Sequence, residues 1–230
     1  MKAKLKGPIF LFLCAFFWGM AFSAQSTAGR YIGPNTFVWL RSTITCLTLL
    51  ILRPLLLKLS PESAQTTASN RRHWVVGAFC GAFLVLATSL QQAGLMTTTT
   101  AKSGFITALY IVLVPIGQVF FKQRIFSRHW LAVAVAVVGM YFLCITDGFS
   151  ISPSDLYLLL CAFLFAVQIL AVDRFSARVD GLVLSCGMFL VVAVLSSLFA
   201  LPLETITLGN IAACIWPLLY IAVFSSCLGY

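Results

Sequence analysis

The chain has 230 residues, of which 61% are hydrophobic and only 9% are charged. Soluble domains are about half apolar and about a quarter charged, so this composition excludes an ordinary water-soluble fold. The net charge of +9 does not indicate a nucleic-acid partner, because the basic residues lie between long apolar runs rather than on one basic face. Uncharged runs of about 20 residues match a hydrocarbon core of roughly 30 Å. We therefore predict an all-α integral membrane protein embedded in the lipid bilayer.

Charged residues and Gly, Pro or Asn breakers divide the sequence into successive apolar spans. The first span follows Lys2, Lys4 and Lys6 and has no convincing small-residue cleavage site, so we interpret it as a helix and not as a signal peptide. The spans are continuously apolar, whereas the strands of a membrane barrel alternate polar with apolar residues. We predict eight transmembrane helices, near residues 7–28, 34–56, 73–95, 98–121, 128–147, 155–173, 181–201 and 213–230.

The distribution of Lys and Arg predicts the orientation in the membrane. With the N-terminus in the cytoplasm, twelve of the fifteen basic residues fall on the cytoplasmic side. The outer side receives Arg30, Arg41 and Lys102, together with the acidic Asp147, Asp155 and Glu204. We expect a multi-pass protein of the plasma membrane with a cytoplasmic N-terminus.

An internal repeat accompanies the span pattern. Residues 13–16 read Leu-Cys-Ala-Phe and so do residues 160–163, an offset of 161 − 14 = 147 residues. The repeat unit holds five spans, an odd number, so the second copy must insert upside down. Inverted repeats are a hallmark of secondary transporters. We predict a first repeat over residues 1–147 with five helices, and an inverted, incomplete second repeat over residues 148–230 with three.

Several local features resemble the EamA type of the drug/metabolite transporter superfamily. They are Phe17-Trp18-Gly19 in the first span, Arg41 in the second, Thr97 to Thr100 followed by Ala101-Lys102-Ser103-Gly104-Phe105, and Pro115 in the fourth. The resemblance implies two inverted five-helix repeats and the transport of a small metabolite or drug-like solute, without a cofactor. The family's glutamate at the cytoplasmic end of the fourth span is replaced here by Phe121-Lys122-Gln123-Arg124.

The leading hypothesis is a secondary transporter that works by alternating access, and the alternative is a truncated, non-transporting fragment of one. An intramembrane enzyme is disfavoured, because His73 and His129 both lie beside cytoplasmic arginines and no catalytic pairing is apparent. The eight cysteines occur singly inside the spans, so no metal site is expected. The sequence leaves a homodimer open.

Two basic residues are candidates for substrate binding. Arg41 lies about two turns into the second span, where its charge either snorkels to the interface or lines a cavity that attracts a metabolite carboxylate. Lys102 lies in the first turn of the fourth span, where an interfacial ammonium is the simpler interpretation. Thr107 follows one turn further along the same helix, whereas Thr97 to Thr100 are expected to cap it.

Polar amides and one aromatic residue complete the candidate site. Gln91, Gln92 and Gln168 would be costly in contact with lipid, so each bonds either to another helix or to substrate. Trp18 forms either a cavity wall or part of the packing. Pro115 is expected to kink the fourth span near the midplane and to suit a gate.

Five glycines are expected to permit close helix approach. These are Gly19, Gly77, Gly81, Gly104 and Gly139, of which Gly77 and Gly81 form a GxxxG motif.

Overall fold

The computed structural model describes residues 2–59, 71–122, 127–144, 152–176, 180–227 and 229. Every regular element within these residues is a helix. In chain order they are α1 (Lys2–Ala28), α2 (Pro34–Leu59), α4 (Arg71–Leu95), α5 (Thr100–Ala108), α6 (Tyr110–Phe120), α7 (Ser127–Cys144), α8 (Pro153–Ser176), α9 (Gly181–Leu203), α10 (Leu208–Ala213), α11 (Ile215–Tyr220) and the π-helix η2 (Ile221–Cys227).

The prediction of an all-α membrane protein is confirmed. Six apolar helical stretches among the described residues are long enough to cross a bilayer: Ile9–Ala28, Pro34–Pro54, His73–Leu95, Thr100–Phe120, Pro153–Phe175 and Gly181–Leu203. The other two expected spans correspond to α7 and to α11 with the π-helix, within which the described apolar stretches are Trp130–Gly139 and Ile215–Cys227. Asp147, which was expected in the outer connection after α7, lies outside the described residues.

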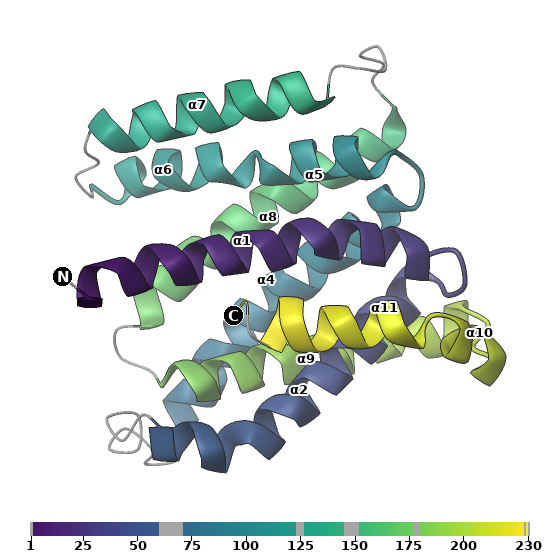
Figure 1. Cartoon of the computed structure of the whole chain (residues 1–230). Helices are drawn as coiled ribbons and strands as arrows, with labels where there is room; N and C mark the ends of the chain where they lie inside the picture. The colour runs from purple at the N-terminus through teal and green to yellow at the C-terminus, as the bar shows by residue number, and fades with distance from the viewer. Residues whose placement is uncertain are drawn as a thin grey trace.

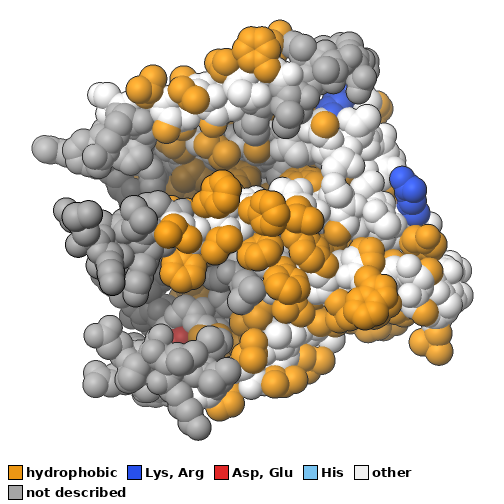
Figure 2. Space-filling model, viewed as in Figure 1, with side chains coloured by type: hydrophobic (Ala, Val, Ile, Leu, Met, Phe, Trp, Pro, Cys, Tyr) orange, Lys and Arg blue, Asp and Glu red, His pale blue; other side chains and the backbone are white. Residues whose placement is uncertain are grey.

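The outward surfaces of the helices are apolar. Figure 2 shows many hydrophobic side chains across the middle of the visible face, and large exposed examples are Phe12 on α1, Phe120 on α6, Leu203 on α9 and Trp216 on α11. Such a surface would order water unfavourably over a wide area, whereas lipid chains solvate it without that cost. The exposed apolar side chains are therefore the lipid-facing surface of a membrane protein.

Long helices that follow one another in the chain run in opposite directions. In Figure 1 the N-terminus lies at the left, where α2 and α8 also end, and the turns between α1 and α2 and between α4 and α5 lie at the right. We call the right-hand end the outer end, following the orientation that the positive-inside rule predicts. Helix α2 packs against α9, α4 packs against α8 and α9, and α11 with the π-helix packs against α1 and α2.

The fourth predicted span is two helices. Leu109 ends α5 and precedes α6, and its N–H bonds to Ile106 O at 3.2 Å, a bond three residues back that tightens this turn. Pro115 lies inside α6, and the helix continues through it. The interruption therefore falls at Leu109, six residues nearer the outer end than the proline where a kink was expected.

Glycines bring α4 and α9 into close contact. A Cβ added at Gly77 would lie 3.1 Å from Gly187 Cα, and one at Gly81 would lie 2.9 Å from Met188 O. The close approach predicted for Gly77 and Gly81 is confirmed. It is wrong for Gly19, Gly104 and Gly139, where an added Cβ would meet nothing within 4 Å. Sequence spacing reveals small residues, but it does not reveal which face of a helix a partner occupies.

We expect Gly81→Leu to destabilise the protein, because the added side chain would collide with the backbone of α9 at Met188. Overpacking of this kind costs roughly 1–3 kcal/mol. The matched control is Gly139→Leu, at a glycine whose Cβ position is open. The measurement is the thermal unfolding midpoint of each purified variant in detergent, and equal midpoints for the two variants would contradict the close packing of α4 on α9.

Candidate functional site

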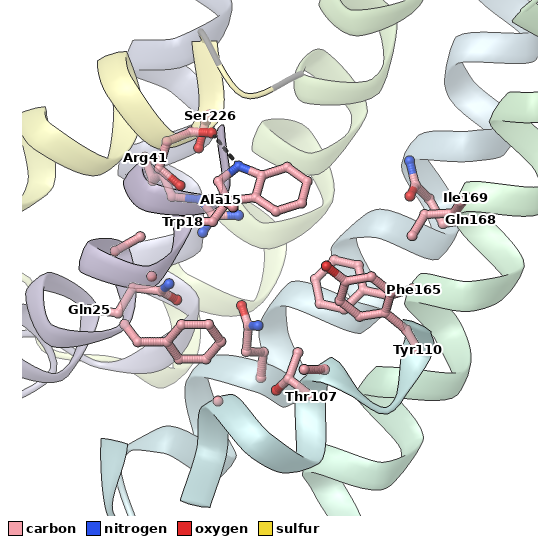
Figure 3. A pocket seen from close by; sticks show the side chains of 17 residues that line it. Ala15, Trp18, Gln25, Arg41, Thr107, Tyr110, Phe165, Gln168, Ile169 and Ser226 are labelled. Atoms are coloured by element: carbon pink, nitrogen blue, oxygen red, sulfur yellow. Dashed lines mark hydrogen bonds between the residues drawn. The ribbon is translucent and has the colours of Figure 1, made fainter. Parts of the chain in front are cut away.

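A cavity of about 270 Å³ lies inside the helix bundle. Side chains from α1, α2, α4, α5, α6, α8 and the π-helix line it (Figure 3). Five of the predicted site residues are among the lining: Trp18, Arg41, Gln91, Thr107 and Gln168. The other three, Gln92, Lys102 and Pro115, do not line it. The cavity therefore brings together residues from six of the eight predicted spans.

Arg41 supplies the charge of the cavity. It lies in the second turn of α2, and the residue is only 6% exposed. Its Cζ lies 5.9 Å from the centroid of the Phe37 ring, within the range of a cation–π contact. The side chain is thus buried and lines the cavity instead of reaching the surface, which favours the cavity interpretation over snorkelling. Arg41 is the charged side chain among the described residues that line the cavity, and none of these is acidic.

Trp18 joins α1 to the π-helix at the cavity wall. Its Nε1–H donates to Ser225 O at 3.0 Å, and nearby the hydroxyl of Thr45 on α2 donates to Ala222 O at 3.0 Å. A carbonyl oxygen has two lone pairs, so these backbone groups can accept side-chain bonds in addition to helical ones. π-Helical turns are frequent at functional sites. Trp18 therefore both lines the cavity and fixes the position of the π-helix beside it.

The three glutamines have different surroundings. Gln92 is fully buried, and its Nε2 donates to Gln25 O on α1 at 3.2 Å. Gln168 Nε2 lies 3.5 Å from Met188 Sδ on α9, although the residue also lines the cavity. Hydrogen bonding between helices thus accounts for Gln92 and in part for Gln168. Gln91 lines the cavity, and its amide forms no hydrogen bond to another helix among the described residues.

Lys102 is an ion-pair residue at the outer end. Its Nζ lies 2.8 Å from Asp155 Oδ2 in the first turn of α8. Thr99 caps α5, because its hydroxyl accepts from Lys102 N at 3.3 Å, as the threonine-rich entry predicted. Asp155 is only 5% exposed and begins a helix that could span the membrane. The structure therefore gives the Lys102 ammonium a specific partner, the carboxylate of Asp155.

Ten residues of the lining were not singled out from the sequence. Those with polar or aromatic side chains are Phe22, Gln25, Tyr110, Phe165, Ser225 and Ser226. Gln25 could have been found, since it is an amide inside an apolar span like Gln91. The aromatic and serine residues carry no such signal, because packing residues of the same types occur throughout the chain. Gly19 and Gly104 also line the cavity, which explains why no helix approaches them.

Polar and aromatic side chains lie on both sides of the cavity, and the guanidinium of Arg41 lies on one of them. Figure 3 shows Arg41, Trp18 and Gln25 on one side, while Tyr110, Phe165 and Gln168 lie on the other. The centroids of the Tyr110 and Phe165 rings are 6.2 Å apart. A guanidinium and hydrogen-bonding groups suit an anionic or polar head, and the rings suit an apolar body. The described residues contain no group of three or more His, Cys, Asp or Glu that could hold a metal ion.

These features define a polytopic α-helical membrane protein with a solute-sized cavity between its helices, lined by both polar and apolar side chains. Residues 5–145 match the EamA-like transporter family, and the chain belongs to that family. It is also 30% identical over 200 residues to an uncharacterized transporter of Archaeoglobus fulgidus. That alignment covers 86% of this chain and 58% of the relative, so the chain spans less than two thirds of the relative's length. No solved structure matches the chain.

We expect Trp18→Phe to lower the thermal unfolding midpoint, because the ring is kept while the bond to Ser225 O is lost. The loss of one such hydrogen bond costs about 1 kcal/mol. The control is Trp216→Phe, since Trp216 is 79% exposed on the lipid-facing surface. Equal midpoints for the two variants, measured in the same detergent, would contradict the role of Trp18 in holding the π-helix.

Proposed function

We propose that this protein is a secondary transporter that carries a small organic anion across the plasma membrane by alternating access. The observation that carries the proposal is the cavity of about 270 Å³, enclosed by apolar helices and lined by the buried guanidinium of Arg41. A polar solute that crosses a bilayer needs a compartment with polar groups to bind it, because the hydrocarbon core offers none. Membership of the EamA-like transporter family supports the transport of a small molecule.

The pairing of helices supports the inverted repeat that alternating access needs. A two-fold axis in the membrane plane would exchange α1 with α8, α2 with α9, and α4 with α11 and the π-helix. Under this exchange, the contact of α4 with α8 corresponds to the contact of α11 and the π-helix with α1. The contact of α4 with α9 corresponds to the contact of the π-helix with α2. Both members of each pair of contacts occur. In Figure 1, α1 and α8 run in opposite directions, as do α2 and α9.

Arg41 is the residue that selects the sign of charge in this proposal. A guanidinium fork can bind a carboxylate with two parallel hydrogen bonds, and the attraction is stronger in a buried site than in water. The rings of Tyr110 and Phe165 face the same cavity and can hold an apolar portion of the solute. The substrate class is therefore an amphipathic organic anion of small size.

Counterflow in proteoliposomes tests the proposal. Vesicles that contain the protein are loaded with one unlabelled compound from a panel of monocarboxylates, zwitterionic amino acids, neutral sugars and organic cations, and uptake of the labelled compound is followed. We expect accumulation of at least one monocarboxylate above protein-free vesicles. Accumulation of cations alone would contradict the substrate class, and accumulation of no compound from a broad panel would contradict the transport function.

We expect Arg41→Gln to lower counterflow of an anionic substrate by about tenfold or more, because a charge-assisted bidentate contact contributes about 1.5–3 kcal/mol. Arg41→Lys keeps the charge but loses the fork, so an intermediate rate is expected. The matched control is Arg30→Gln, at an exposed arginine just before the turn into α2. Equal uptake by the Arg41 and Arg30 variants would show that Arg41 does not bind the solute.

A further inference from the structure

Two carboxylates connect the two halves of the chain at the outer end. The first belongs to Asp155 in the first turn of α8, whose Oδ2 lies 2.8 Å from Lys102 Nζ in the first turn of α5. The same carboxylate oxygen accepts from Ser152 N at 2.7 Å, which fixes the start of α8. Lys102 lies in the predicted first repeat and Asp155 in the second, so this ion pair joins the repeats.

The second carboxylate belongs to Glu204, which follows the end of α9. Its Oε1 accepts from Asn35 N at 2.8 Å and from Asn35 Nδ2 at 2.9 Å, and its Oε2 accepts from Thr36 N at 2.8 Å. These backbone donors belong to the first turn of α2, where N–H groups lack helical partners and the helix dipole attracts negative charge. A side chain of the second repeat therefore caps a helix of the first.

Gly33 makes room for the Glu204 carboxylate. A Cβ added at Gly33 would collide with the carboxylate atoms of Glu204. The approach depends on this glycine, and an alanine there would displace the carboxylate from α2 without altering its charge.

Both connections lie above the cavity along the same helices. Gly104 and Thr107 line the cavity and follow Lys102 by two and five residues on α5. Arg41 lines it and follows Thr36 by five residues on α2. At the opposite end the carboxylate of Asp180 caps its own helix, by accepting from Leu182 N and Val183 N. The connections between the repeats are thus on the outer side of the cavity.

The ion pair uses only one oxygen of the Asp155 carboxylate. Asp155 Oδ1 is buried, and no hydrogen-bond partner for it occurs among the described residues. A buried acceptor without a partner costs free energy, and more so when it is charged. Separation of α5 from α8 would let water reach this oxygen. Hydration of this oxygen would therefore offset part of the free energy lost when the ion pair breaks. A small net cost is needed if the closed and open conformations are to have similar free energies.

We propose that Lys102–Asp155 and Glu204–Asn35/Thr36 together form an outer gate, which holds the cavity closed to the outer side and breaks when the cavity opens there. This inference rests on the proposed function, because it assigns the contacts to one of the two states of alternating access. The gate consists of polar contacts between repeats, so a change in one repeat relative to the other must break both.

The test is the rate at which a cysteine in the cavity reacts with a membrane-impermeant maleimide added outside intact cells. The reporter is Gly104→Cys, because Gly104 lines the cavity and an added Cβ meets nothing within 4 Å. Cells that carry the protein without this change measure the reaction of its native cysteines. In the reporter background, Asp155→Asn is expected to raise the labelling rate about tenfold, which corresponds to about 1.4 kcal/mol.

Charge reversal separates the ion pair from a general loosening of the fold. Lys102→Asp alone is expected to raise labelling, and the combination of Lys102→Asp with Asp155→Lys is expected to restore protection. Asp173→Asn is the matched control, because this exposed carboxylate lies at the opposite end of α8.

Glu204→Gln and Gly33→Ala are each expected to raise labelling by a similar factor. In inside-out vesicles none of these variants is expected to label faster.

Unchanged outside labelling in Asp155→Asn, or failure of the swapped pair to restore protection, would overturn the gate. Because labelling does not require transport, the two proposals fail separately. Faster labelling in a protein that transports nothing would support the gate and refute the proposed function. Transport that depends on Arg41, with labelling insensitive to both carboxylates, would refute the gate alone.

Discussion

A bilayer interior cannot hydrogen-bond to a polypeptide, and this constraint shapes the whole molecule. Each backbone N–H and C=O in the membrane must find a partner within the protein, so the spanning segments are helices. Apolar side chains then cover the outward surfaces (Figure 2), while polar side chains gather between helices. Polar side chains from several of these helices line the cavity, where a solute could bind to them.

The same constraint explains the local irregularities. The span that begins at Thr100 is interrupted at Leu109, and the last described span continues as a π-helix from Ile221. Irregular backbone at membrane depth is tolerated where protein or a polar cavity surrounds it. Both irregularities adjoin the cavity: Ala108 and Tyr110 flank the first and line it, and Ser225 and Ser226 belong to the second. Departures from a regular helix thus coincide with the candidate functional site.

The arrangement also separates two kinds of polar contact. Arg41, Gln91 and their neighbours surround a volume into which a solute can fit. A second set of charged side chains instead forms contacts between helices at the outer end, namely Lys102, Asp155 and Glu204. Under the proposed function the first set would recognise the solute and the second would control access to it. Since both sets include residues from each predicted repeat, solute binding and the relative position of the repeats are structurally linked.

The sequence by itself determined that the protein resides in a lipid bilayer, that it is helical, and where most helices begin and end. The length of an apolar run and the charges at its ends are properties of each segment alone. It also named Arg41 and Gln91 as candidates, since polar groups inside apolar spans are costly, but it left snorkelling and bonding between helices open as alternatives to a place at a cavity. Only the tertiary structure decided that Gln92 bonds to α1, that Lys102 pairs with Asp155, and that Gly81 contacts α9 while Gly104 faces the cavity. Those outcomes depend on which faces of two helices meet. The spacing of residues along one helix shows which of them share a face, but it does not show which face of a neighbouring helix packs against them.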